Sequence, residues 1–113
     1  MKNLISLVVI SITLFLACEK KDRDLNVSIK SNDYRVEITN EDSFNYENAE
    51  LEINGKYKIK GVTIKAGETY KAYWSDFFDS DYNKFNPSSM SRQKFTIYCD
   101  IYDGSKGFFY GEK

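Results

Sequence analysis

The stretch AELEINGKYKIK, residues 49–60, decides how this chain folds, because it holds two runs of alternating apolar and charged residues on either side of a turn. Alternation with a period of two is typical of a β-strand with one buried face. A two-residue turn at Asn54 and Gly55 would pair Ile53 with Lys56 and place a lysine on the buried face. We therefore reject this register.

A three-residue loop, residues 54–56, restores the alternation across both runs. It pairs Ile53 with Tyr57 on the inner face and Glu52 with Lys58 on the outer face. The further pairs are Leu51 with Ile59 and Glu50 with Lys60. Each buried Ile or Leu contributes roughly 1.5–3 kcal/mol, whereas a favourable turn type contributes a few tenths. We predict an antiparallel hairpin with this loop, and a crossover into a second sheet is the alternative.

The same alternation continues on both sides of this hairpin. Further strand-like runs lie at residues 25–30, 34–39, 62–64, 70–74, 95–101 and 108–111. The first two flank the turn residues 31–33 and are expected to form a hairpin, with Tyr34, Val36 and Ile38 facing inward. Tyr70, Ala72 and Trp74 share one face, as do Phe95, Ile97, Cys99 and Ile101.

About seven short strands in fewer than 100 residues predict an all-β fold with the strands in two antiparallel sheets. We expect an immunoglobulin-like sandwich over residues 25–113, with a small barrel as the alternative. Cys99 lies in a row of inward apolar residues, so we expect a buried thiol rather than a reactive one.

The first 17 residues differ from the rest. Lys2 gives a short positive start, and residues 4–17 form an uncharged, mainly apolar run of 14 residues. As a helix this run would span about 21 Å, which is short of the ~30 Å hydrocarbon core of a bilayer. The pattern predicts a cleaved signal peptide over residues 1–17.

The sequence FLAC, residues 15–18, resembles the lipobox of bacterial lipoproteins. This resemblance implies that the thiol of Cys18 is acylated and that Cys18 becomes the first residue of the mature protein, held in a membrane at about 0.8 kcal/mol per buried methylene. The alternative is an ordinary secretory signal in which Cys18 stands by chance. If Cys18 is acylated, residues 18–24 form the lipidated cysteine and a charged tether, with EKKDRD reaching at most ~20 Å.

The charged residues after Cys18 look like those of Bacteroidota lipoproteins that are sent to the cell surface. We therefore expect a cell-envelope protein in the outer membrane rather than the inner one, on either its periplasmic face or the cell surface. The stretch VEITNEDSFNYENAELEING, continued by GVTIKAGETY, resembles uncharacterised small envelope proteins with an immunoglobulin-like or fibronectin-III-like domain. That resemblance implies a fold and carries no activity.

Composition excludes several classes of function. The chain has 16 basic and 17 acidic residues, so it lacks the basic excess typical of nucleic-acid binding, and we predict no nucleic-acid partner. It contains no histidine, which excludes Ser-His-Asp and Cys-His catalytic groups and histidine-ligated zinc. No nucleophile, base or cofactor motif is recognisable, so we predict no enzyme activity and no cofactor.

Asp79, Asp81 and Asn83 have the alternate spacing that begins a calcium loop. However, Lys84 replaces the turn glycine and Met90 replaces the closing glutamate. We therefore predict no metal site here and a polar surface loop instead.

The span of residues 73–85 combines aromatic and acidic residues without clear periodicity. We expect some of these side chains to form an exposed binding surface, with Tyr73, Phe78, Asp79, Asp81 and Tyr82 as candidates. The alternative for Phe77 and Phe85 is that they close the open end of the sandwich.

Together these features predict a non-catalytic binding or structural module that is attached to a membrane and meets another envelope protein. The alternative function is a surface lipoprotein that binds a glycan through loop 73–85.

Overall fold

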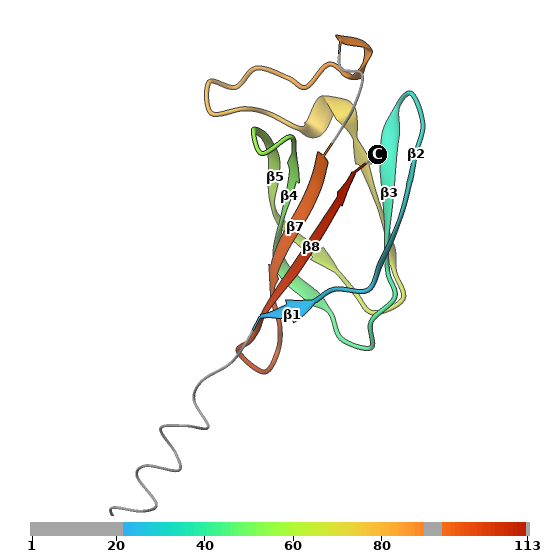
Figure 1. Cartoon of the computed structure of the whole chain (residues 1–113), viewed down its shortest axis with the longest axis vertical. Helices are drawn as coiled ribbons and strands as arrows, with labels where there is room; N and C mark the ends of the chain where they lie inside the picture. Colours follow the sequence, from blue (N-terminus) through green and yellow to red (C-terminus); the bar gives the residue numbers. More distant parts are fainter. Residues whose placement is uncertain (1–21, 90–93, 113) are drawn as a thin grey trace, which may run out of the picture.

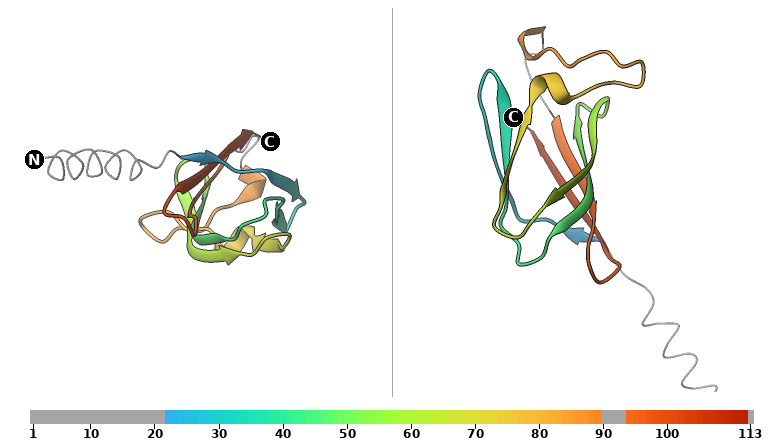
Figure 2. Two further views of the ribbon diagram at one scale, coloured as in Figure 1. Left: turned by 90° about the horizontal axis from the view of Figure 1, so that it is seen from below. Right: turned by 180° about the vertical axis from the view of Figure 1, so that it is seen from behind.

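The computed structural model describes residues 22–89 and 94–112 of the chain, so the predicted signal segment and Cys18 lie outside the described residues. Two β-sheets pack face to face (Figures 1 and 2). The strands are β1 (Arg23–Asp24), β2 (Val27–Ser31), β3 (Arg35–Asn40), β4 (Tyr46–Ile53), β5 (Tyr57–Ile64), β6 (Thr69–Tyr73), β7 (Lys94–Asp100) and β8 (Lys106–Glu112). Two short 3₁₀ turns, η1 (Trp74–Asp76) and η2 (Pro87–Ser89), lie between β6 and β7.

The larger sheet has the order β1-β8-β7-β4-β5 and the smaller one β2-β3-β6. Every neighbouring pair is antiparallel except β1 with β8. With β2, β3 and β6 as strands A, B and E, and β8, β7, β4 and β5 as G, F, C and C′, this order is immunoglobulin-like. The predicted two-sheet sandwich is therefore confirmed, and the sheets do not close into a barrel.

The hairpin of β4 and β5 has the predicted register. Ile53 pairs with Tyr57, Leu51 with Ile59 and Glu52 with Lys58, as predicted, whereas the predicted pair Glu50 with Lys60 falls at a register shift between Ala49 and Leu51. Further along, each strand contains an irregularity, at Asn48 in β4 and at Gly61 in β5, where φ is 47° and 74° respectively. These bulges bend the outer strand of the sheet.

The core lies between the two sheets and is built from the inward faces of the strands. Phe95, Ile97, Cys99 and Ile101 are all buried, as predicted, and so are Val36, Ile38, Leu51, Ile53, Val62, Ile64 and Ala72. Burial raises the pKa of the Cys99 thiol to about 11, so the group is neutral at physiological pH. The expected buried thiol is confirmed.

The predicted hairpin of β2 and β3 also forms, but Tyr34 does not face inward. Its side chain is 77% exposed, because the strand begins one residue later, at Arg35. The side-chain oxygen of Asn32 accepts hydrogen bonds from the backbone N–H groups of Tyr34 and Arg35. This side-chain turn holds Tyr34 in the loop, so the expectation that it belongs to the inner face was wrong.

At one end of the sandwich, a cluster of aromatic rings closes the core. Phe77 is fully buried and Phe85 is 3% exposed. The ring of Phe85 lies 5.5 Å from that of Trp74 and 5.2 Å from that of Tyr57, and Phe77 lies 6.4 Å from Phe95. Phe77 and Phe85 therefore close the end of the sandwich, which was the alternative interpretation of these two residues. We call this end the loop end.

The opposite end, which we call the N-terminal end, carries β1 beside the turn between β7 and β8 (Figure 1). β1 lies within the stretch expected as a tether, and Arg23 forms an ion pair with Asp103 of that turn. Leu25 follows and is buried against Gly107, where a Cβ atom would lie 2.5 Å from its Cδ2. The folded domain thus begins before Leu25, and its first strand and loop 74–89 lie at opposite ends (Figure 1).

A buried polar network fixes the loop between β3 and β4 at this end. Asn40 is fully buried; its side-chain nitrogen donates to the carbonyl oxygens of Phe44 and Ile64, at 2.9 and 3.0 Å. The side-chain oxygen of Asn40 accepts from the backbone N–H of Asp42. The hydroxyl of the buried Tyr46 donates to the Asp42 carboxylate at 2.6 Å. The loop is therefore held by side chains rather than by a strand ladder.

Candidate functional site

The structure separates the predicted site residues into two groups. Tyr73, at the end of β6, lies on the outer face of the small sheet, where its neighbour Arg35 on β3 has its guanidinium carbon 5.9 Å from the Tyr73 ring centre. Phe78 and Tyr82 lie beside β5, at the edge of the large sheet. Cys18 lies outside the described residues.

Asp79 organises the loop instead of facing solvent. The residue is only 9% exposed, and its carboxylate accepts hydrogen bonds from the backbone N–H groups of Asp81 and Asn83, at 2.9 and 2.8 Å. Asp81 and Tyr82 are exposed, and Tyr82 has a φ of 63°, a conformation rare for a bulky residue. The Asp79 carboxylate thus supports the backbone that presents Tyr82.

These hydrogen bonds make the loop sensitive to acid. Donation from Asn83 lowers the pKa of Asp79 from its usual value. The folded loop is therefore stabilised above the pKa of an unfolded Asp, about 3.9, and this stabilisation is lost as pH falls through the lower folded value. We expect the Asn83 amide resonance in an NMR titration to shift with a midpoint below that of a free Asp. A midpoint at or above about 3.9 would contradict this, and Asp79→Asn should abolish the transition.

A groove lies between this loop and β5. Two backbone hydrogen bonds join Lys58 to Phe78, one from each N–H to the other residue's carbonyl oxygen, at 2.9 and 3.3 Å. The loop therefore continues the large sheet by one residue at this edge. The groove has a volume of about 580 Å³ and is lined by Gly55, Lys56, Lys58, Lys60, Phe78, Asp79, Ser80 and Tyr82. We call it the loop groove.

The outer face of the large sheet continues from this groove towards β8. In register order its side chains are Lys58 and Lys60 on β5, Glu52 and Glu50 on β4, Thr96 and Tyr98 on β7, and Tyr110 and Phe108 on β8. We call these eight residues the ladder face. The loop groove and the ladder face form one continuous surface, because Lys58 and Lys60 belong to both.

Charged side chains pair across the middle of the ladder face. Lys58 lies 3.9 Å from Glu52, and Lys60 lies 3.9 Å from Glu50. Burial raises the pKa of Glu52, and the charge of Lys58 opposes this effect. The predicted outer-face pairs of the hairpin are therefore present, and the centre of the face carries two charges of each sign.

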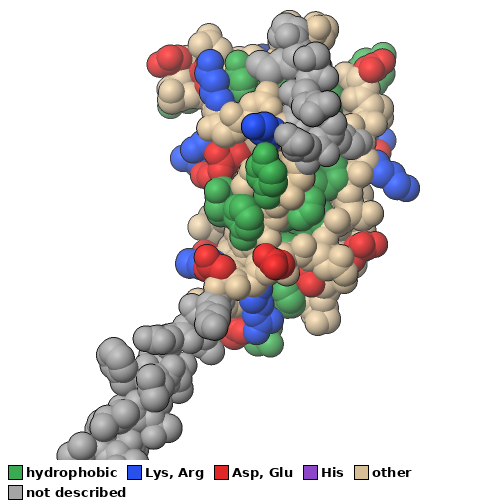
Figure 3. All heavy atoms as spheres, in the orientation of Figure 1, with side chains coloured by type: hydrophobic (Ala, Val, Ile, Leu, Met, Phe, Trp, Pro, Cys, Tyr) green, Lys and Arg blue, Asp and Glu red, His purple; other side chains and the backbone are tan. Residues whose placement is uncertain are grey.

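The ladder face also exposes aromatic rings. Tyr98 is 46% exposed and Tyr110 52%, and the ring centre of Phe108 lies 5.3 Å from that of Tyr98 with the two planes inclined at 52°. Figure 3 shows hydrophobic side chains gathered at the surface over β7 and β8. Sequence reasoning missed this cluster as a site, although the inward assignment of Phe95 and Ile97 implied that Tyr98 points outward.

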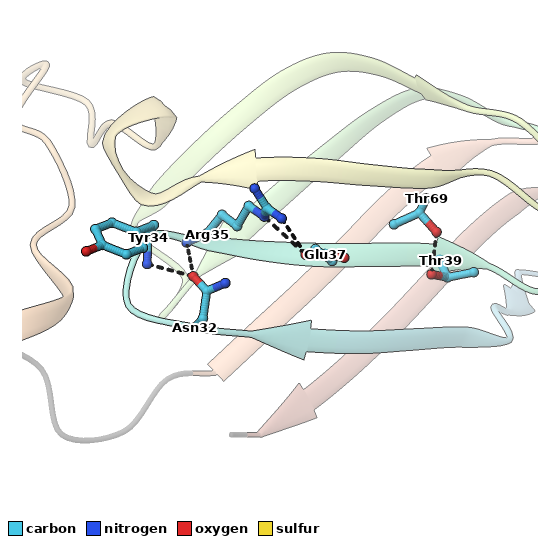
Figure 4. A network of polar contacts seen from close by, with 6 residues as sticks. All are labelled: Asn32, Tyr34, Arg35, Glu37, Thr39 and Thr69. Carbon is cyan, nitrogen blue, oxygen red and sulfur yellow. Dashed lines mark hydrogen bonds and ion pairs between the residues drawn. The ribbon is translucent and has the colours of Figure 1, made fainter.

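The outer face of the small sheet is more polar. Arg35 donates to the Glu37 carboxylate along β3, and the hydroxyls of Thr39 and Thr69 are hydrogen-bonded between β3 and β6 (Figure 4). Tyr34 and Tyr73 line a shallower hollow of about 500 Å³ at the loop end of this sheet. The polar contacts satisfy one another, so this face offers less apolar area for a partner.

Residues 22–89 and 94–112 contain no group of three or more His, Cys, Asp or Glu side chains placed to hold a metal ion. Over the same two ranges, no helix is long and apolar enough to cross a membrane.

Comparison with models of protein families, with curated proteins and with solved structures found no match to this chain. Tyrosine rings beside paired charges offer apolar contact together with hydrogen-bonding groups, which is the composition of many protein interfaces.

Proposed function

We propose that this chain is a lipid-anchored cell-envelope protein whose immunoglobulin-like domain is a non-catalytic protein-binding module. The observation that carries the binding role is the aromatic cluster of the ladder face. Its rings are inclined to one another instead of forming a flat row, and they adjoin paired charges. A compact cluster of this kind suits a protein surface, whereas a flat row of rings would suit stacking against a sugar chain.

The position of β1 supports the anchored orientation. The chain enters the domain at Asp22, four residues after Cys18, so an extended connection reaches about 14 Å. An acylated Cys18 would thus hold the N-terminal end close to the membrane and turn the loop end away from it. The ladder face runs between these ends along the strands and stays accessible from the side.

The anchor is tested by Cys18→Ser. This substitution removes the only thiol at the proposed acylation site, and loss of the acyl chains removes the membrane affinity of about 0.8 kcal/mol per methylene. We expect the substituted chain to leave the membrane fraction and appear in the soluble envelope fraction. Cys99→Ser is the matched control and should remain with membranes. A Cys18→Ser chain that still sediments with membranes would contradict the anchor.

The binding role is tested by affinity capture from solubilised native envelopes. Tyr98→Ala should remove a protein that the unsubstituted chain captures reproducibly, because tyrosines in desolvated contacts commonly contribute more than 1 kcal/mol to binding. Tyr34→Ala is the control, since Tyr34 is 77% exposed on a different surface. Equal capture by the unsubstituted and Tyr98→Ala chains would contradict the role of this face.

A second candidate function is glycan binding, favoured by the loop groove. Phe78 and Tyr82 flank this groove of about 580 Å³, whose lysines and Ser80 could form hydrogen bonds with sugar hydroxyls. Retention on a column of envelope glycans that is lost with Tyr82→Ala, and unaffected by Tyr98→Ala, would favour this function over protein binding.

A further inference from the structure

The ladder face has a regular order of side chains when it is followed across the strands. One row contains Lys58, Glu52, Thr96 and Tyr110, and the next contains Lys60, Glu50, Tyr98 and Phe108. Phe78 extends the first row beyond Lys58. In both rows a cation on β5 is followed by an anion on β4. Phe78 and Tyr110 lie at the two ends of the first row, and Tyr98 and Phe108 lie beyond Glu50 in the second.

This order is complementary to itself. In an interface with two-fold symmetry, both subunits use the same patch. The outward side chains of each strand form a strip, and a strip on one side of the axis contacts the partner's copy of the strip that lies equally far on the other side. If the axis runs along the strands between β4 and β5, the lysine strip of one copy meets the glutamate strip of the other. The same rotation brings Phe78 of the second copy opposite Thr96, which lies between Glu52 and Tyr110 in the first row.

We propose that the ladder face binds a second copy of this chain through this two-fold arrangement. The inference rests on the proposed function, because it names the partner of the binding module. Opposite charges meet at both lysine–glutamate rows, and like charges meet at neither. Aromatic side chains flank these rows, and aromatic residues are enriched in protein interfaces.

The direction of the proposed two-fold axis allows both copies to be attached to the same membrane. An axis parallel to the strands leaves the N-terminal ends of both copies on the same side. Both chains enter their domains at β1, so both could be held by one membrane, whereas an axis across the strands would send the two anchors in opposite directions. The membrane attachment and the proposed pairing are therefore geometrically compatible.

The contact is expected to be weak in solution. Four strands about 4.8 Å apart, over about 20 Å of their length, cover roughly 400 Å² of sheet face. This is below the ~800 Å² that each partner buries in a standard interface. Attachment to one membrane raises the effective concentration of the two domains and favours their association.

The test uses charge reversal in two copies of the full chain that carry different C-terminal tags and are expressed together. Lys60 has a side chain 72% exposed, and Glu50 one 29% exposed, so substitutions there should preserve the fold. In a pair of Lys60→Glu chains, four carboxylates would meet. In a pair of Glu50→Lys chains, four ammonium groups would meet. We expect either substitution alone to reduce capture of the second copy at least about ten-fold.

The decisive sample combines one Lys60→Glu copy with one Glu50→Lys copy. In this pair the carboxylates of the first chain again meet the lysines of the second, so capture should return to within about two-fold of the unsubstituted chain. Lys71→Glu, on the exposed side of β6, is the control for an unrelated change of charge and should leave capture unchanged. Thermal unfolding of each variant verifies that its fold is intact.

The inference is overturned if unsubstituted copies do not capture one another, or if the mixed pair does not recover. If unsubstituted copies fail to associate while Tyr98→Ala still removes a different envelope protein, the second-copy inference is wrong and the proposed binding role remains. Membrane release by Cys18→Ser is measured separately, so failure of the anchor cannot be mistaken for failure of the pairing.

Discussion

Phe77→Ala should lower the free energy of unfolding by about 3–5 kcal/mol, the range observed when a fully buried phenylalanine is truncated. Phe77 has no exposed surface, and its ring contacts those of Trp74 and Phe95 at the loop end of the core. The neighbouring rings come from different elements, so they cannot move together to fill the cavity. Chemical denaturation followed by far-UV circular dichroism and by the fluorescence of Trp74, the single tryptophan of the chain, measures this change.

The matched control is its neighbour in the sequence, Phe78→Ala. Phe78 is 36% exposed and holds the loop to β5 through its backbone, which the substitution keeps. We expect a loss below about 1.5 kcal/mol. Equal losses for Phe77→Ala and Phe78→Ala would mean that the core does not extend to the loop end.

Asn40→Ala should lower the free energy of unfolding by about 2–4 kcal/mol, because it leaves one buried and two partly buried polar groups without their hydrogen-bond partner. The side chain of Asn40 is the hydrogen-bond partner of the carbonyl oxygens of Phe44 and Ile64 and of the backbone N–H of Asp42. Alanine supplies neither the side-chain donor nor the acceptor. Denaturation with urea, with the midpoint and slope compared to the unsubstituted chain, measures the effect.

Asn40→Asp keeps the shape of the side chain but removes its N–H donors, so it separates the contribution of the hydrogen bonds from that of shape. Aspartate keeps the acceptor but places a negative charge beside two carbonyl oxygens, so it should be at least as destabilising at neutral pH. Burial of this carboxyl group among carbonyl oxygens would raise its pKa, so its destabilising effect should decrease as the pH is lowered and the group becomes protonated. Stability that is unchanged in Asn40→Ala would show that water replaces these contacts without cost.

The hairpins of this fold could be predicted from alternation alone. In residues 49–60 both the register and the three-residue loop followed from keeping Leu and Ile on one face, and the structure has the pairs Leu51 with Ile59 and Ile53 with Tyr57. Packing determines register strongly here, since a shift of one residue would exchange the two faces of the strand. The buried row from Phe95 to Ile101 was predicted for the same reason.

The candidate site was less predictable, because the residue type alone does not show whether these side chains face the core or the solvent. In β8, Phe108 and Phe109 are adjacent aromatic residues, so one must face outward, and composition alone does not say which. Asp79 has the composition of an exposed loop residue but turns its carboxylate to the backbone of its own loop. Tyr34 was misplaced because a side-chain turn at Asn32 holds it in the loop, so the alternation of β3 begins one residue later, at Arg35.

The two-residue strand β1 has a mechanical consequence. A pull on the domain through its N-terminus loads the β1–β8 pairing and the ion pair of Arg23 with Asp103 before any other strand. This short parallel pairing would peel away first, while the hairpin of β2 and β3 keeps five paired residues on each strand. Release of residues 22–26 would lengthen the connection by about 17 Å. Under tension, β1 would therefore detach and lengthen the connection to the N-terminus before the two sheets of the sandwich unfold.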